Sequence, residues 1–224
     1  MTASDVLASV QMTLLDAQGA YWPLAELLAY LNQARVRLSA LRPDLYEQAA
    51  TVTLAAGTEQ SLPAQMPMML RAISNASHPE RLAITVTSEE VLARVRPRWR
   101  SMTPADEVQH VLYTESAPRR FEVYPPVKAG VQIRLSGPVT PAPIPVAALD
   151  TELAPEQSMA TALVDAVLAR AFAKEGDANA AALARAATHE AAFLAAVGAE
   201  GGTRAGASPN KTAPGERPAG GVAQ

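Results

Sequence analysis

The 224-residue sequence contains no cysteine. This absence excludes disulfide bonds, thiol nucleophiles and zinc–thiolate sites together, and it is typical of a protein from a reducing compartment. The sequence also lacks an uninterrupted run of about 20 apolar residues, the length that crosses a bilayer. Basic residues are missing just after Met1, where a signal peptide would carry them. We therefore expect a soluble protein with no membrane-spanning segment.

Aromatic residues and net positive charge are also scarce. Only 4% of the residues are aromatic, so alanine, leucine and valine must form most of the core. Alanine buries little side-chain area, and we expect the alanine-rich helices to gain part of their stability from neighbouring subunits. The formal net charge is −3, whereas a protein that grips DNA phosphates normally carries a positive excess. The charge therefore favours a role other than holding DNA.

Apolar residues recur at helical spacing near both ends of the chain. A short helix is predicted over about 5–15, capped by Thr2 or Ser4, and a longer one over 23–41 with Pro23 in its first turn. Two more helices are predicted over about 155–174 and 179–197. The turn between them is so short that they must form an antiparallel hairpin.

The middle of the chain has the two-residue alternation of half-buried strands. Strands are predicted at 50–54, 59–62, 69–74, 81–86, 108–113, 121–124 and 131–136, with Pro125 and Pro126 ending the sixth. Thr87 and Glu90 form a possible capping box for a short helix that ends near Val95.

Together these patterns predict an α+β fold. Its helical bundle is expected to comprise residues 1–47 and 150–197, and an antiparallel β-rich region, residues 48–149, is inserted between them. The last part of that insertion, from Gly137 onward, is rich in proline and should be an extended connection.

Residues 198–224 differ sharply in composition from the rest. They hold seven of the 12 glycines of the chain and only one large aliphatic residue, Val222. Such a segment cannot offset its ordering entropy by burying itself. We therefore predict an extended tail that is held by a partner molecule.

No catalytic or metal-binding pattern is present in the sequence. The three histidines, His78, His110 and His189, belong to different predicted elements, and none has a second histidine three or four residues away. Nucleophile elbows, P-loops and dinucleotide-binding glycine motifs are missing. The neighbouring Glu89 and Glu90 begin a predicted helix, where the helix dipole accounts for them. The sequence therefore predicts a protein that is not an enzyme and has no cofactor.

One cluster of charge stands out, formed by Arg94, Arg96, Arg98, Trp99 and Arg100. Such arginines could contact a phosphate backbone while the indole stacks on a base. Alternatively, they form a subunit interface in which the arginines meet carboxylates of the next copy and the tryptophan anchors the contact. The acidic net charge favours the interface.

Several segments, in this order, resemble phage head-to-tail adaptor (connector) proteins, which are similar in role to tail tubular protein A. They are YWPLAELLAYLN (21–32), RPDLY (42–46), TVTLAAGTEQSLP (51–63), RPRW (96–99), PADEV (104–108), FEVYPP (121–126) and LVDAVLARAF (163–172). Each is a packing or turn pattern rather than a catalytic motif, and the resemblance spans about residues 22–197.

The resemblance implies a structural role in the virion neck. It implies a cyclic ring of roughly a dozen copies, assembled in the host cytoplasm and docked between the portal and a downstream tail or nozzle protein. DNA would pass through the ring without sequence-specific binding, and the resemblance implies no active site. The tail residues that we expect to bind the portal are Arg204, Pro209, Lys211, Pro214, Arg217 and Val222.

Three alternatives remain open at this point. A head-completion or tail-terminator subunit of the same particle is the nearest, although tail-terminator rings are usually β-rich throughout. A nucleic-acid-binding module built on the arginine cluster is the second, and it predicts steeply salt-dependent binding to DNA. An enzyme is the third, and nothing in the sequence favours it.

Overall fold

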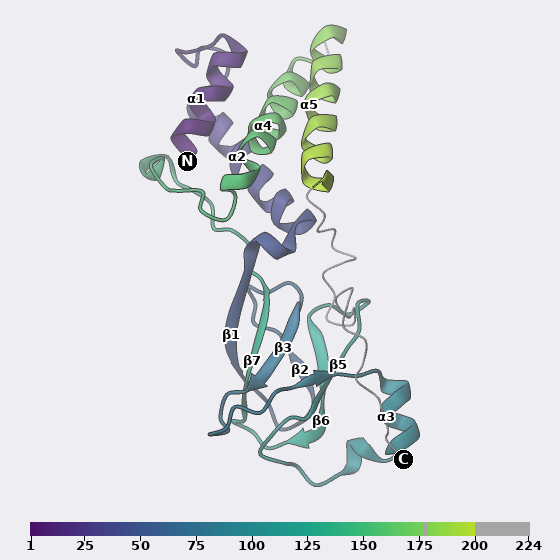
Figure 1. The fold of residues 1–224 in the computed structure, drawn as a ribbon. Helices are drawn as coiled ribbons and strands as arrows, with labels where there is room; N and C mark the ends of the chain where they lie inside the picture. The colour runs from purple at the N-terminus through teal and green to yellow at the C-terminus, as the bar shows by residue number, and fades with distance from the viewer. Residues whose placement is uncertain (177–178, 200–224) are drawn as a thin grey trace, which may run out of the picture. The chain divides into compact units, whose positions relative to one another are not determined.

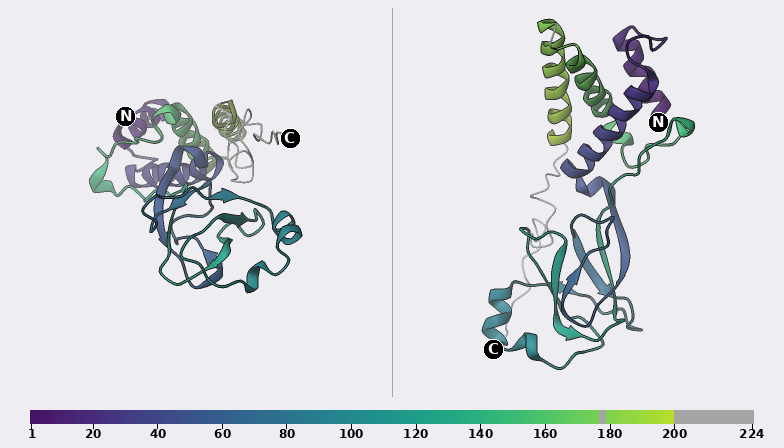
Figure 2. Two further views of the ribbon diagram at one scale, coloured as in Figure 1. Left: turned by 60° about the horizontal axis from the view of Figure 1, so that its bottom comes forward. Right: turned by 180° about the vertical axis from the view of Figure 1, so that it is seen from behind.

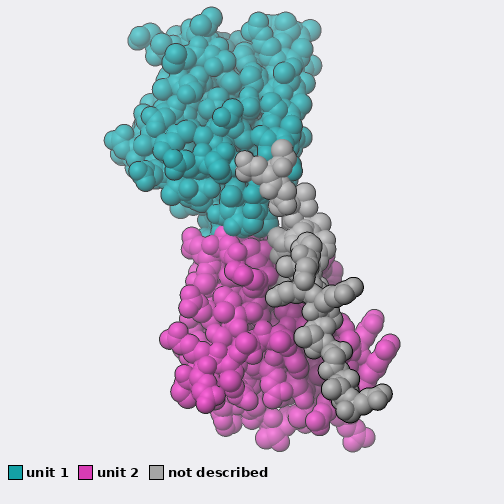
Figure 3. Space-filling model, viewed as in Figure 1, with its two compact units in different colours: residues 1–46, 139–204 teal, residues 47–138, 205–224 magenta. Residues whose placement is uncertain are grey.

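The computed structural model describes residues 1–176 and 179–199, and the chain divides into two compact units (Figure 3). The described part of the first unit is formed by residues 1–46 and 139–199, and that of the second by Glu47–Pro138. The predicted α+β fold class is confirmed. The predicted tail lies outside the described residues from position 200 onward.

The first unit is helical (Figure 1). Its helices are α1 (Ala3–Leu14), α2 (Leu24–Leu41), α4 (Ala160–Lys174) and α5 (Ala180–Ala199), with short 3-10 turns η1 (Pro43–Tyr46), η3 (Val146–Ala148) and η4 (Gln157–Met159). Helix α4 packs against α1, α2 and α5, which Figure 2 shows from two further directions. The connection before α4 joins the same core through Ile144 and Leu153.

The first helix begins and ends as its sequence indicates. Thr2 and Asp5 form a reciprocal capping box, in which each side chain accepts a hydrogen bond from the backbone N–H of the other residue. Leu15 ends the helix in the left-handed conformation. Asp16 then accepts hydrogen bonds from the N–H groups of Ala20, Tyr21 and Trp22 at 2.8, 2.9 and 2.9 Å, which closes the turn before α2.

These hydrogen bonds make the turn sensitive to pH. They hold the pKa of Asp16 below its ordinary value of 3.8, so its stabilising effect is present above that value and is lost as the pH falls through the lower, folded-state pKa. In D16N this dependence should disappear: the variant is less stable than the parent at pH 7, and the difference is lost as the pH falls below the folded-state pKa of Asp16. Urea unfolding at a series of pH values from 7 downward, followed by Trp22 fluorescence in a W99F background, measures the difference. Parallel curves for the two proteins would contradict it.

The second unit contains two small sheets. One has the strand order β1-β7-β3, from Glu47–Thr53, Gln132–Pro138 and Arg71–Asn75. The other has the order β2-β6-β5-β4, from Gly57–Ser61, Arg120–Val127, His110–Tyr113 and Thr85–Val86. Apolar side chains of both sheets form one core that includes Val111, Val123, Ile133 and Leu135. Helix α3 (Glu89–Val95) and the 3-10 turn η2 (Trp99–Ser101) follow β4.

The prediction that Pro125 and Pro126 end a strand is wrong, because β6 continues through both to Val127. A proline lacks the N–H that a sheet needs. In β6 this costs nothing, since the pairing with β5 stops at Tyr124 and the register with β2 shifts between Glu59 and Gly57. The two prolines therefore lie between the last pair with β5 and the next pair with β2, and the Pro126 carbonyl still accepts a hydrogen bond from the Ala105 N–H at 2.8 Å.

The segment after β3 differs from prediction in three ways. The strand predicted over 81–86 is reduced to Thr85–Val86: Arg81 has a left-handed backbone, and Ala83 forms only an isolated bridge with Ser74. This strand pairs in parallel with β5, whereas an antiparallel sheet was expected. Ser88, not Thr87, caps α3 by accepting a hydrogen bond from the Val91 N–H.

Candidate interaction surfaces

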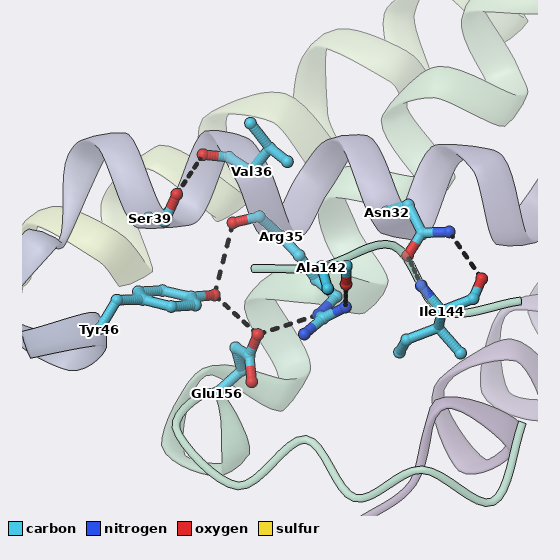
Figure 4. Close-up of polar contacts among 8 residues, drawn as sticks. All are labelled: Asn32, Arg35, Val36, Ser39, Tyr46, Ala142, Ile144 and Glu156. Atoms are coloured by element: carbon cyan, nitrogen blue, oxygen red, sulfur yellow. Dashed lines mark hydrogen bonds and ion pairs between the residues drawn. The ribbon is translucent and has the colours of Figure 1, made fainter. Parts of the chain in front are cut away.

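The helical unit contains a buried polar network centred on Glu156, whose side chain is fully buried (Figure 4). Its Oε1 atom accepts hydrogen bonds from Arg35 Nε at 2.9 Å and from the Tyr46 hydroxyl at 2.8 Å. Arg35 also donates to the Ala142 carbonyl at 2.9 Å. Burial, followed by the neighbouring carboxylate, raises the pKa of Tyr46, so its hydroxyl stays a donor. The network holds the irregular connection before α4 onto α2.

A second pair of hydrogen bonds holds the same connection, one helical turn away along α2. The Asn32 amide donates to the Ile144 carbonyl at 3.0 Å and accepts from the Ile144 N–H at 2.9 Å. Nothing in the sequence pattern singles out Asn32, Arg35 or Glu156, since each is an ordinary polar residue on or near a predicted helix. Both groups of contacts join side chains to backbone or to one another, and this arrangement is typical of a structural role.

The three histidines do not come together in a site. His189 contacts Asp165 at 2.8 Å and stacks on Phe172 in the helical unit. In the β unit, His110 stacks on Tyr124 and burial lowers its pKa, while His78 lies 3.9 Å from Glu107. Within residues 1–176 and 179–199, no group of three histidine, aspartate or glutamate side chains is placed to hold a metal ion. In the same residues, no helix is both long and apolar enough to cross a membrane.

The predicted arginine cluster divides into an inner and an outer part. Trp99 is only 1% exposed and packs with Leu92, Leu112 and Tyr124 on one face of the four-stranded sheet. The Arg100 guanidinium lies 4.4 Å from the centre of the Trp99 ring and forms ion pairs with Glu89 and Glu122, both at 2.8 Å. Trp99 and Arg100 therefore find their partners within their own chain, and the buried indole is not available to stack on a base.

The outer part is the segment 94–98, which we call the arginine turn. Arg94, Arg96 and Arg98 are exposed and have no ion pair with any residue that the structure describes. Val95 is 71% exposed between them, and a hollow of about 410 Å³ follows, lined by Arg96, Pro97, Arg98 and Met102 among others. Exposed apolar atoms rimmed by arginine are typical of a protein-binding surface.

A larger groove, of about 1320 Å³, lies on the same unit. Four carboxylates line it, those of Glu59, Glu89, Glu90 and Glu122, together with one guanidinium, that of Arg120. Residues Glu59 and Glu122 are direct partners across strands β2 and β6, so their side chains leave the sheet on the same face. We call this surface the acidic groove. Sequence reasoning missed it because its carboxylates come from three separate segments.

The comparison with protein families supplies the identity. The sequence model of the SU10 adaptor protein family matches residues 1–214, nearly the whole chain. The chain belongs to this family. No curated protein in the comparison matches it. The predicted resemblance to phage adaptor proteins is thereby confirmed, and this SU10 adaptor is a structural protein of the phage neck, a role that indicates assembly rather than catalysis.

The predicted portal-binding residues of this SU10 adaptor cannot be placed in its fold. Arg204, Pro209, Lys211, Pro214, Arg217 and Val222 all lie outside the described residues. Arg217 and Val222 also lie beyond the part of the chain that the family model matches. A portal contact by these residues therefore stays a prediction.

Proposed function

We propose that this SU10 adaptor forms a cyclic ring of about a dozen copies between the portal and the tail of the virion. The ring surrounds the DNA passage, lets DNA through during ejection without sequence-specific binding, and offers a docking surface to a downstream tail or nozzle protein. The proposal rests first on family membership, since an adaptor joins two other components. The protein would then act by assembly alone, with no catalytic step and no cofactor.

The observation that supports self-association best is the arginine turn. Three exposed arginines that form no ion pair with any described residue surround the exposed Val95, and such a surface gains most from contact with carboxylates of another molecule. In this proposal Arg94, Arg96 and Arg98 contact the next subunit. Trp99 and Arg100 do not contact the next subunit themselves; they hold the turn in place on the sheet.

The C-terminal tail is proposed to contact the portal. Its lysine and arginines, Arg204, Lys211 and Arg217, would pair with portal carboxylates, while its prolines keep the segment extended. A tail of this kind adds contact area in each of many identical copies, so the total affinity of a ring exceeds that of one tail by orders of magnitude.

The test is binding to the purified portal ring of the same phage. We expect the full-length protein to sediment with the portal as a complex, and a version ending at Ala199 to bind at least about tenfold more weakly because its tail contacts are lost. Equal binding by both versions would contradict the tail contact but leave the adaptor role. No binding by the full-length protein would contradict the adaptor role itself.

The nucleic-acid-binding alternative predicts a different result in a simple assay. If the arginine turn grips DNA, binding to duplex or single-stranded DNA falls steeply with salt and is abolished in R94A/R96A/R98A. The burial of Trp99 removes the stacking contact on which this alternative relied. We therefore expect no more than weak, sequence-independent binding.

A further inference from the structure

The β unit carries two charged surfaces of opposite sign, and the described part of the chain supplies no ion pair to most of their charged groups. One is the arginine turn, with Arg94, Arg96 and Arg98. The other is the acidic groove, in which Glu59 and Glu90 have no ion pair with any described residue. Each surface also exposes apolar atoms, from Val95 and Met102 on the turn and from the half-buried Val86 in the groove.

The groove is built in a way that favours a cationic occupant. Like charges directly opposite one another in a sheet are destabilising, and Glu59 faces Glu122 across β2 and β6. Within the chain, Arg100 relieves part of this repulsion by pairing with Glu122 and Glu89. Glu59 and Glu90 have no ion-pair partner among the described residues, so the groove attracts a further cation.

The turn does not fill the groove of its own copy. Glu89 and Glu90 lie in the first turn of α3, whereas Arg94 lies in its last turn and Arg96 and Arg98 follow the helix. Arg100, which comes after the turn, reaches back to Glu89, but Arg94, Arg96 and Arg98 form no ion pair with any described residue. The side chain of Trp99, buried beneath the turn, fixes the turn to the sheet.

We propose that the arginine turn of one copy docks in the acidic groove of the next copy. Arg96 and Arg98 meet Glu59 and Glu90, and Val95 adds apolar contact. The two surfaces are different, so the contact is head-to-tail, and repetition of such a contact closes a ring when the rotation between copies allows it. This inference rests on the proposed ring and names the surfaces that build it.

Two charge reversals test the contact. E59K/E90K makes the groove basic, and R96E/R98E makes the turn acidic. Glu89 and Glu122 are left in place because they hold Arg100. Matched controls carry the same changes in charge on exposed residues outside the groove lining and the arginine turn: E80K/E115K for the groove and R81E/R119E for the turn.

The readout is assembly on the portal ring, measured as complex mass against protein concentration. We expect each reversal alone to raise the concentration for half assembly by about a hundredfold, because like charges then face each other. An equimolar mixture of the two reversed proteins should bring this concentration back to within about threefold of the wild-type value. In a ring where the two proteins alternate, every contact again joins opposite charges. Both controls should assemble as the wild type does.

Three results would overturn the contact. Wild-type assembly by either reversed protein shows that the ring is built by other surfaces, while the proposed ring itself stands. Failure of the mixture shows that the two surfaces do not meet one another. A wild-type protein that forms no ring on the portal removes both the inference and the proposed function.

Cross-linking gives a second measure that does not depend on altered charge. Because the chain has no cysteine, R98C and E59C each place a single thiol on one surface. On the portal, a mixture of the two should yield covalent heterodimers through a short bismaleimide, and each variant alone should yield almost none. Homodimers in preference to heterodimers would contradict the head-to-tail contact.

Discussion

Replacing Glu156 with alanine is expected to destabilise the helical unit by about 3–5 kcal/mol. The change leaves the Arg35 guanidinium buried without its carboxylate and leaves the Tyr46 hydroxyl with only its longer hydrogen bond, to the Arg35 carbonyl at 3.4 Å. An uncompensated buried charge costs far more than the loss of one surface contact, because water cannot reach it. The connection before α4 should then detach from α2.

The control removes both charges at once. In R35M/E156L apolar groups of similar volume replace the pair, and we expect most of the lost stability to return, because Glu156 Oε2 accepts no hydrogen bond from any described residue. The chain offers a clean reporter, since it has two tryptophans, one in each unit. In a W99F background, Trp22 alone reports urea unfolding of the helical unit. A loss below about 1 kcal/mol in E156A would contradict the role of the network.

Replacing Trp99 with alanine is expected to destabilise the β unit by about 3–5 kcal/mol. The indole fills the space between Leu92, Leu112 and Tyr124, and it lies under the Arg100 guanidinium. Its removal leaves a cavity under a short helix with few other apolar anchors. We expect α3 and the arginine turn to lose their fixed position before the rest of the sheet unfolds.

Hydrogen exchange measured by mass spectrometry follows this effect peptide by peptide. Amides of residues 88–102 should exchange fastest in W99A, those of β5 and β6 less so, and the helical unit should be unchanged. W99F is the matched control and should stay within about 2 kcal/mol of the wild type, because an aromatic ring still fills most of the space. Uniform protection across the β unit in W99A would contradict a local role for the indole.

The helices could be predicted from the sequence because a single face of each is apolar. Leu27, Leu31 and Leu38 recur at helical spacing and are all fully buried. Thr2 was one of two candidate caps, and its capping box with Asp5 decides between them. Apolar spacing and capping residues do not depend on what the helix packs against, so predictions made from them hold in the folded protein.

The β unit was harder to predict, since strand pairing is set by residues far apart in sequence. The continuation of β6 through Pro125 and Pro126 depends on where β5 and β2 stop pairing with it. The parallel pairing of Thr85 with His110 depends on the path of α3 and η2 between them. Neither is visible in the two-residue alternation, which indicates a strand but not its neighbour.

The sequence shows the arginine turn as a cluster of charge, but it does not show in which direction each side chain points. Burial of Trp99 follows from the sheet face that α3 and η2 cover. The acidic groove could not be predicted, because the pairing of Glu59 with Glu122 is a matter of register. The partners of Arg35 were equally hidden, since Glu156 lies 121 positions further along the chain.

The proposed closure of a ring on the portal underlies the other proposals for this SU10 adaptor. The most direct measurement is the mass of the complex that the full-length protein forms with the purified portal ring, determined by native mass spectrometry. We expect one dominant species with about twelve adaptor copies on each portal and no intermediate of comparable abundance. A broad series of partly loaded portals, a two-fold dimer in place of a ring, or no complex would contradict it.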